Sequence, residues 1–234
     1  MKSNFKLIIR SIVCGIPLLI LTGCFQQTMT AMNSIGSSLG VSTPDIDAFI
    51  AKEQNFENQI GKIADSLFKA MASDEEIAKM NEMKKRLNET TDDKEKFALR
   101  QQITESELAT IEKRAKDSEL QQQAKNWDAR KKKHVSDSWY NFSLSILQGT
   151  VLVLEGTNLV NTYTMRANKD PVGTGIILTF KLPAVTVALK SMVGILDNMR
   201  TTGRALFTFM SEAQINAKAP TSAAEKPREI EGGI

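Results

Sequence analysis

Apolar residues recur three and four positions apart along the stretch that begins at Asp45. The series consists of Ile46, Phe49, Phe56, Ile60, Ile63, Leu67 and Ala70. This spacing predicts an amphipathic helix. Glu53 is the exception, because it places a charged side chain at one position of the apolar seam. Ser73 followed by Glu76 is typical of a capping box, so a second helix is predicted to begin there.

The stretch from residue 92 to residue 133 contains neither Pro nor Gly, and its charges mix in sign. One continuous helix over this stretch would be more than about 60 Å long. Its apolar stripe is thin, which favours packing against one neighbour over burial in a core. Residues 45–138 are therefore predicted to form long, polar, amphipathic helices.

From Trp139 the chain becomes strongly apolar. Two apolar segments, residues 139–163 and 176–199, flank a polar break that contains Asp170-Pro171 and Gly173-Thr174-Gly175. This pattern predicts a helical hairpin, with short strands at residues 176–181 and at Val185 and Val187 as the alternative, because apolar runs of this length fit both. A last helix is predicted over residues 204–217.

Together these patterns predict an all-α fold, an elongated helical bundle or coiled-coil-like body with an apolar helical hairpin in the C-terminal half. Residues 139–217 are expected to pack with residues 45–138 as one domain, followed by a disordered tail at residues 218–234. Whether the long helices fold back as a bundle or project as a rod stays open. Insertion of the hairpin, residues 142–199, into a bilayer also stays open. The charged residues Glu155, Lys181 and Lys190 argue against insertion, because a charge near mid-membrane costs at least about 2.5 kcal/mol.

The first residues have the layout of a secretory signal. A basic head contains Lys2, Lys6 and Arg10. It leads into an almost wholly apolar run over residues 7–21, which Gly15 and Pro17 interrupt. A run this short is disfavoured as a bilayer span, which needs about 20 apolar residues. A cleaved segment is therefore predicted.

The residues that close this run, Leu21-Thr22-Gly23-Cys24, resemble the lipobox of bacterial lipoproteins. The resemblance implies cleavage of residues 1–23, a diacylglycerol thioether on Cys24, and acylation, such as palmitoylation, of its new amino group. Cys14 follows the bulky Val13 and does not fit the pattern. Phe25 stands where Asp would retain an enterobacterial lipoprotein in the inner membrane, so the resemblance implies a lipid anchor at the periplasmic face of the outer membrane. The inner membrane and the cell surface stay open. Residues 24–44, rich in Ser, Thr and Gly, are expected to be a flexible tether.

Processing removes the excess of positive charge. The chain has 30 basic and 27 acidic residues, and the predicted signal holds three of the bases, which leaves 27 of each. A nucleic-acid partner is therefore not expected. The strongest charge run, Arg130, Lys131, Lys132 and Lys133, is interpreted either as a contact for an anionic surface or as a solvated helix face.

Motifs for chemistry are lacking in the sequence. It contains no phosphate-binding glycine loop, no CxxC or HExxH and no nucleophile elbow, and His134 is the single histidine. Catalytic residues, cofactors and metals are therefore predicted to be absent. The leading hypothesis is a non-enzymatic envelope lipoprotein that contacts membrane lipid through acylated Cys24 and envelope proteins through its helical body, in a secretion, transport, conjugation or appendage assembly. Self-association stays open. The alternatives are a membrane-active protein that inserts residues 142–199 and, third, a cell-wall enzyme that depends on His134.

Overall fold

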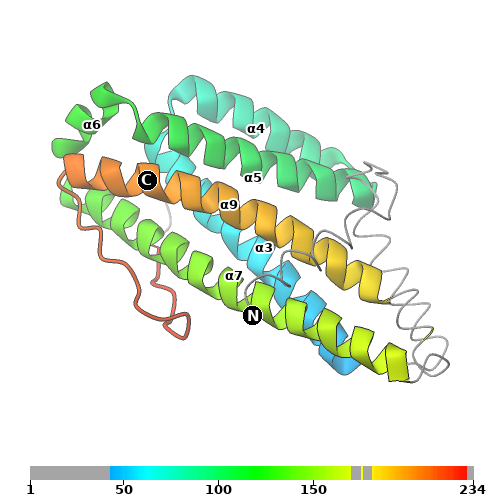
Figure 1. Cartoon of the computed structure of the whole chain (residues 1–234). Helices are drawn as coiled ribbons and strands as arrows, with labels where there is room; N and C mark the ends of the chain where they lie inside the picture. Colours follow the sequence, from blue (N-terminus) through cyan, green and yellow to red (C-terminus); the bar gives the residue numbers. More distant parts are fainter. Residues whose placement is uncertain (1–42, 170–174, 176–180, 231–234) are drawn as a thin grey trace.

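The computed structural model describes residues 43–169, residue 175 and residues 181–230, and these form an all-α body (Figure 1). The fold class predicted from the sequence is thereby confirmed. The described helices are α3 (Pro44–Met71), α4 (Asp74–Glu89), α5 (Asp93–Ala115), α6 (Ser118–Lys125), α7 (Ala129–Lys169) and α9 (Leu182–Glu212).

Four long helices form a folded-back bundle. α3 packs against α7, α5 and α9, and α9 in turn packs against α7 and α5. α4 lies on the outside of α5, and short α6 lies near the end of α9 (Figure 1). The long helices therefore lie side by side and do not project as a rod.

The apolar series predicted for α3 is its buried face. Each of the seven apolar residues in the series is at most 5 % exposed. Glu53 lies in the same row and is 1 % exposed, so the charged interruption of the seam is buried with the apolar residues around it. The periodicity therefore identified both the helix and its inward face.

In the apolar C-terminal half, α7 and α9 pack against each other, as predicted for the two arms of the hairpin. The polar break predicted to connect them falls largely on residues 170–174, which lie outside the described residues. Gly149 of α7 lies beneath the Phe56 ring of α3 and Leu196 of α9, and Gly156 lies beneath Phe49 and Leu189 in the same way. Since only glycine leaves room for both neighbours, these two positions allow three helices to approach one another closely. Val185 and Val187 belong to α9, so strand structure at these two positions is excluded.

The stretch predicted as one helix over residues 92–133 is divided into three. Asp117 caps α6 by accepting hydrogen bonds from the backbone N–H groups of Glu119 and Leu120, at 2.9 and 3.3 Å. Asp128 accepts a hydrogen bond of 2.7 Å from the Lys131 N–H at the start of α7. Because a capping carboxylate satisfies the amides that a helix start leaves free, each aspartate favours a new helix over continuation of the previous one. One continuous helix over residues 92–133, a possibility that the sequence left open, does not form.

The last helix also differs from its prediction. α9 runs without interruption from Leu182 to Glu212, so the separate helix predicted over residues 204–217 is its second half. The helix ends before Gln214, whose φ of 55° is incompatible with a right-handed helix. The Ile215 N–H then donates to the Met210 carbonyl at 2.8 Å, which turns the chain back toward α7.

Residues 218–230 lie along the first half of α7, where the sequence had predicted a disordered tail (Figure 1). Asn141 donates to the Arg228 carbonyl at 2.8 Å and accepts from the Arg228 N–H at 2.7 Å, while Gln148 donates to the Ala223 carbonyl at 3.2 Å. The Arg228 guanidinium lies 3.8 Å from the Tyr140 ring centroid. Polar side chains on an otherwise buried helix thus bind this segment, which the tail's own polar composition could not indicate.

The predicted capping box at the start of α4 is confirmed. Ser73 Oγ accepts from the Glu76 N–H at 3.4 Å, and Glu76 Oε2 accepts from the Ser73 N–H at 3.0 Å. Glu76 also accepts from Arg114 of α5 at 2.7 Å. Burial opposes ionisation of Glu76, but the hydrogen bonds from Ser73 and Arg114 outweigh it and lower the pKa of Glu76 to about 2. One carboxylate therefore both caps α4 and joins it to α5.

Among the described residues, α7 is the one helix long and apolar enough to cross a membrane by length and composition. Of its most apolar window, 28 % is buried inside the bundle. Its exposed apolar side chains include Val151, Leu154 and Met165, at 54 %, 61 % and 60 % exposure. The same helix therefore contributes to the core on one side and presents apolar side chains to the surroundings on the other.

Candidate functional site

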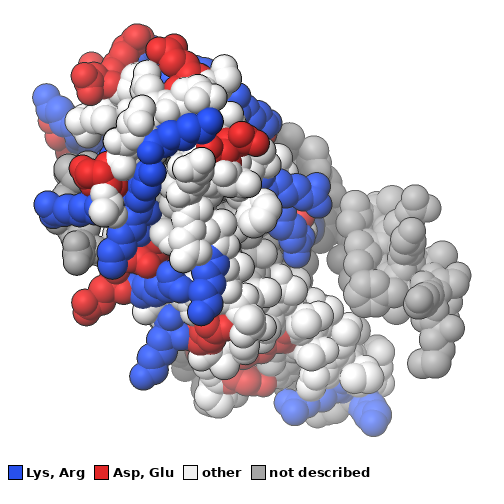
Figure 2. All heavy atoms as spheres, turned by 90° about the vertical axis from the view of Figure 1, so that its left-hand side faces the viewer, with Lys and Arg blue, Asp and Glu red and all other residues white. Residues whose placement is uncertain are grey.

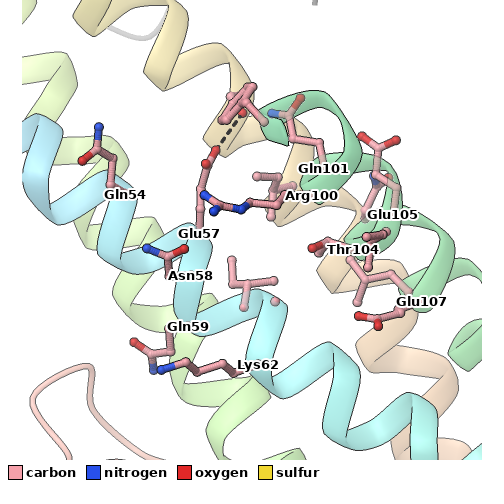
Figure 3. A pocket seen from close by; sticks show the side chains of 18 of the residues that line it. Gln54, Glu57, Asn58, Gln59, Lys62, Arg100, Gln101, Thr104, Glu105 and Glu107 are labelled. Carbon is pink, nitrogen blue, oxygen red and sulfur yellow. Dashed lines mark hydrogen bonds between the residues drawn. The ribbon is translucent and has the colours of Figure 1, made fainter. Parts of the chain in front are cut away.

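A cleft of about 900 Å³ opens between α3, α5 and α9, beside the first half of α5 (Figure 3). α3 and α9 make few contacts with each other, whereas each packs well against α5, and this arrangement leaves the space between them. α3 lines the cleft with Glu53, Gln54, Glu57 and Asn58, α5 with Arg100, Gln101, Thr104 and Glu107, and α9 with Lys190, Ser191, Ile195 and Asn198. Most of the residues that line the cleft are polar, which sets it apart from the apolar core beneath it.

Two carboxyl groups one helical turn apart dominate the wall formed by α3. Glu53 and Glu57 share a hydrogen bond, and Ser191 Oγ of α9 donates to Glu57 Oε1 at 3.2 Å (Figure 3). Glu53 Oε1 is buried and accepts no hydrogen bond from the N–H and O–H donors of other described residues. A hydrogen bond between two carboxyl groups requires a proton on one of them, so the pair holds one proton between its members.

The environment places that proton on Glu53. Burial first, and then the charge of Glu57 and the shared hydrogen bond, raise the pKa of Glu53 to about 9. Burial also raises the pKa of Glu57, although the hydrogen bonds from Glu53 and Ser191 counteract part of this. The proton of the pair therefore lies on Glu53, next to the Glu57 carboxyl group at the side of the cleft.

A second ionic cluster lies at the other end of the cleft and is already neutralised within the protein. Lys84 of α4 forms ion pairs with Asp65 of α3 at 2.5 Å and with Glu107 of α5 at 2.8 Å. Burial raises the pKa of Glu107 to about 7, although Lys84 opposes the shift. This cluster joins three helices, and none of its described ion pairs includes Glu53.

Exposed cations surround the mouth of the cleft. Lys62 of α3, Arg100 of α5 and Lys190 of α9 are lined up along it, and none of the three forms an ion pair with another residue that the structure describes. Arg100 extends from α5 across the opening toward α3 (Figure 3). The cleft therefore combines an anionic, proton-sharing pair inside with free positive charge at its rim.

The basic run predicted as an anionic-surface contact begins α7, at the end of the bundle near α6. Lys131 Nζ lies 4.2 Å from the Trp127 ring centroid, and burial lowers the pKa of Lys131. Lys132 donates to the Lys125 carbonyl at 2.7 Å, and Lys133 pairs with Asp137 at 2.7 Å. Arg130 is exposed. At this end of the molecule basic and acidic side chains are interspersed (Figure 2).

His134 does not form a triad with its neighbours in sequence. Its Nε2 lies 2.9 Å from Ser66 Oγ of α3. Ser136 instead donates to the Asn216 carbonyl, and Asp137 pairs with Lys133 and Arg228. The histidine thus joins α3 to α7 without a carboxylate partner in this set.

Cys24, the predicted lipidation site, lies outside the described residues. The sequence pattern shows Glu53 as a charged interruption of the apolar seam but does not identify it as part of a site. A glutamate at a core position of an amphipathic helix was the available signal, since an unpaired charge is rarely buried without a functional or structural reason. Glu57, Arg100 and Ser191 carried no comparable signal, because their approach to Glu53 depends on how three helices pack.

The described residues contain no group of three or more His, Cys, Asp or Glu side chains arranged to hold a metal ion. The cleft can instead accept hydrogen bonds on its carboxyl pair and offer cations at its mouth.

In the comparisons with known proteins, no family model, no curated protein and no solved structure matches this chain.

Proposed function

We propose that this protein is a lipid-anchored, non-enzymatic component of the bacterial cell envelope, held by acylated Cys24 at the periplasmic face of the outer membrane. The observation that carries the proposal is the sequence Leu21-Thr22-Gly23-Cys24 after a basic and apolar leader. The first described helix begins at Pro44, so residues 25–43 separate it from the acylated cysteine. A chain of this length spans roughly 25 Å when flexible, enough to hold the body clear of the lipid headgroups.

The body suits a role in assembly. Its buried surface packs long helices together, and several of its described ion pairs join neighbouring helices. Long, rigid, mixed-charge helices present extended surfaces to other proteins. We therefore propose a scaffold role in a secretion, transport, conjugation or appendage complex, with other envelope proteins as partners.

Replacement of Cys24 tests the anchor. Cys24→Ala is expected to abolish incorporation of radiolabelled palmitate and to move the protein from the membrane fraction to the soluble fraction, because more than one acyl chain is needed for stable attachment. Cys14→Ala is the matched control and should keep both the label and the membrane location. Continued labelling of the Cys24 variant would refute the proposed lipidation.

Crosslinking of the wild-type protein in intact cells should then capture envelope proteins in fixed ratio, and recovery of the chain alone would contradict the assembly role.

A second candidate function is membrane insertion of the α7–α9 hairpin, favoured by the length and composition of α7 and by its exposed Val151, Leu154 and Met165. Against it, the packing of Gly149 and Gly156 under aromatic rings of α3 places the other side of the hairpin in the bundle core.

Dye release from liposomes distinguishes the two functions. The assembly role predicts no release by the wild-type protein. Insertion predicts release that Leu154→Asp abolishes and that Asn158→Asp, an exposed polar position on the same helix, leaves unchanged. Leu154 is exposed, so its replacement should not disturb the fold.

A further inference from the structure

The buried carboxyl of Glu53 lacks the hydrogen-bond donor that its position calls for. It is 1 % exposed, and its Oε1 accepts nothing from described donors outside the carboxyl pair. A buried acceptor left without a donor is costly, so native proteins rarely keep one without a reason. Glu53 Oε1 itself is closed to solvent, but Glu57 beside it is partly exposed and lines the same cleft, so a molecule that enters the cleft can donate to the carboxyl pair through Glu57.

The charges around the cleft indicate the chemistry of that molecule. Glu53 and Glu57 together offer several acceptor lone pairs and share a proton, which suits a group with more than one N–H donor and a positive charge. Arg100 and Lys190 at the mouth repel a simple cation and attract an anionic group. A ligand that carries both an ammonium and a carboxylate satisfies both parts of the site.

The size of the cleft further limits the kind of ligand that fits it. About 900 Å³ is within the range of sites that hold drug-sized ligands and exceeds the needs of a single amino acid. The amides of a peptide would also find partners in the side-chain amides and hydroxyl along the lining, Gln54, Asn58, Gln101 and Thr104.

From these observations we infer that the cleft between α3, α5 and α9 binds a short peptide, with its terminal ammonium group at Glu53 and Glu57 and its carboxylate at Arg100 and Lys190. The peptide is a ligand in this assignment, and no bond in it is broken. The site is separate from the proposed anchor, so the outcome of the Cys24 experiment does not decide it.

Calorimetric titration of the full-length protein with trialanine tests the inference. Trialanine should bind, and L-alanine should bind at least tenfold more weakly because it lacks the peptide groups that the side-chain amides and hydroxyl of the lining would bind. N-acetyl-trialanine, which lacks the ammonium, and trialanine amide, which lacks the carboxylate, should each bind at least tenfold more weakly than trialanine. These ligand changes leave the protein untouched, so they do not depend on whether a variant folds.

Variants then assign each end of the peptide. Glu57→Gln should weaken trialanine binding at least tenfold without affecting N-acetyl-trialanine, and Arg100→Gln should weaken trialanine without affecting trialanine amide. Glu105→Gln, an exposed carboxylate on the same cleft, is the matched control and should bind like the wild type. Absence of trialanine binding at concentrations on the order of 10 mM, a free energy weaker than about 3 kcal/mol, overturns the inference, as does equal binding of N-acetyl-trialanine.

Discussion

Alanine at Gly149 or Gly156 is expected to lower the free energy of unfolding by about 1 to 3 kcal/mol. A Cβ at Gly156 would lie 2.5 Å from Phe49 Cζ and 2.7 Å from Leu189 Cδ2, and one at Gly149 would collide with the Phe56 ring and lie 2.8 Å from Leu196 Cδ2. Real Cβ atoms do not approach other atoms this closely, so both rings and leucines would have to move within a packed core. Urea unfolding followed by circular dichroism measures the loss.

Gly194 supplies the matched control, because it also lies inside a helix but has no atom within 4 Å of its added Cβ. Alanine there should stabilise the protein by up to about 1 kcal/mol, since glycine is the poorer helix former. In a double-mutant cycle, Phe49→Leu should cost less in the Gly156→Ala protein than in the wild type, because the smaller side chain relieves the clash. Equal effects of alanine at Gly156 and Gly194 would show that α3 does not pack closely on α7.

Glu53→Gln is expected to remove most of a strong pH dependence of stability. In the unfolded chain Glu53 has its ordinary pKa of 4.5, and folding raises that pKa to about 9. Between these values the folded protein holds a proton that the unfolded chain has released. The contribution to stability is therefore fully present below about pH 4.5 and is lost as the pH rises toward 9. We expect the wild type to lose about 2 to 4 kcal/mol relative to Glu53→Gln between pH 5 and pH 8.

Thermal unfolding of both proteins across this range measures the difference. The charged groups that line the cleft around Glu53 are Glu57 on α3, Arg100 on α5 and Lys190 on α9, and all three are retained in the variant. Glu107 titrates in part of the same range but is common to both proteins, so the difference between them reports on the Glu53 and Glu57 pair. Glu105→Gln should follow the wild-type profile. Parallel profiles for the wild type and Glu53→Gln would mean that the buried carboxyl is ionised in the folded protein.

Periodicity was sufficient to predict much of this fold. The apolar seam from Ile46 to Ala70 predicted α3 and its buried face. The Ser73 and Glu76 pair predicted where α4 begins, and the two apolar segments predicted the α7–α9 hairpin. The divisions at Asp117 and Asp128 were missed because an aspartate on a polar helix face and an aspartate that caps a new helix look alike when charges of both signs surround them. The ordered segment at residues 218–230 was missed because its partners are side chains of α7, far away in sequence.

The site could be anticipated only in part, for the same physical reason. Glu53 breaks the apolar pattern of its own helix, so the helix alone reveals that something unusual is buried there. Its partners lie 4 residues away on α3, on α5 and on α9, and only the packing of these helices determines that Ser191 and Arg100 share a cleft with it. A sequence pattern records what one element buries, whereas a cleft is formed by what neighbouring elements leave unfilled.

The 41-residue helix α7 extends through the whole bundle, about 60 Å, and has different neighbours along its length. Its first half is covered by residues 218–230, and its middle holds the glycines on which α3 and α9 rest. If one end of the bundle unfolds locally, the unfolding must either stop within α7 or include the whole of α7. The two ends of the bundle are therefore joined by one continuous helix, α7.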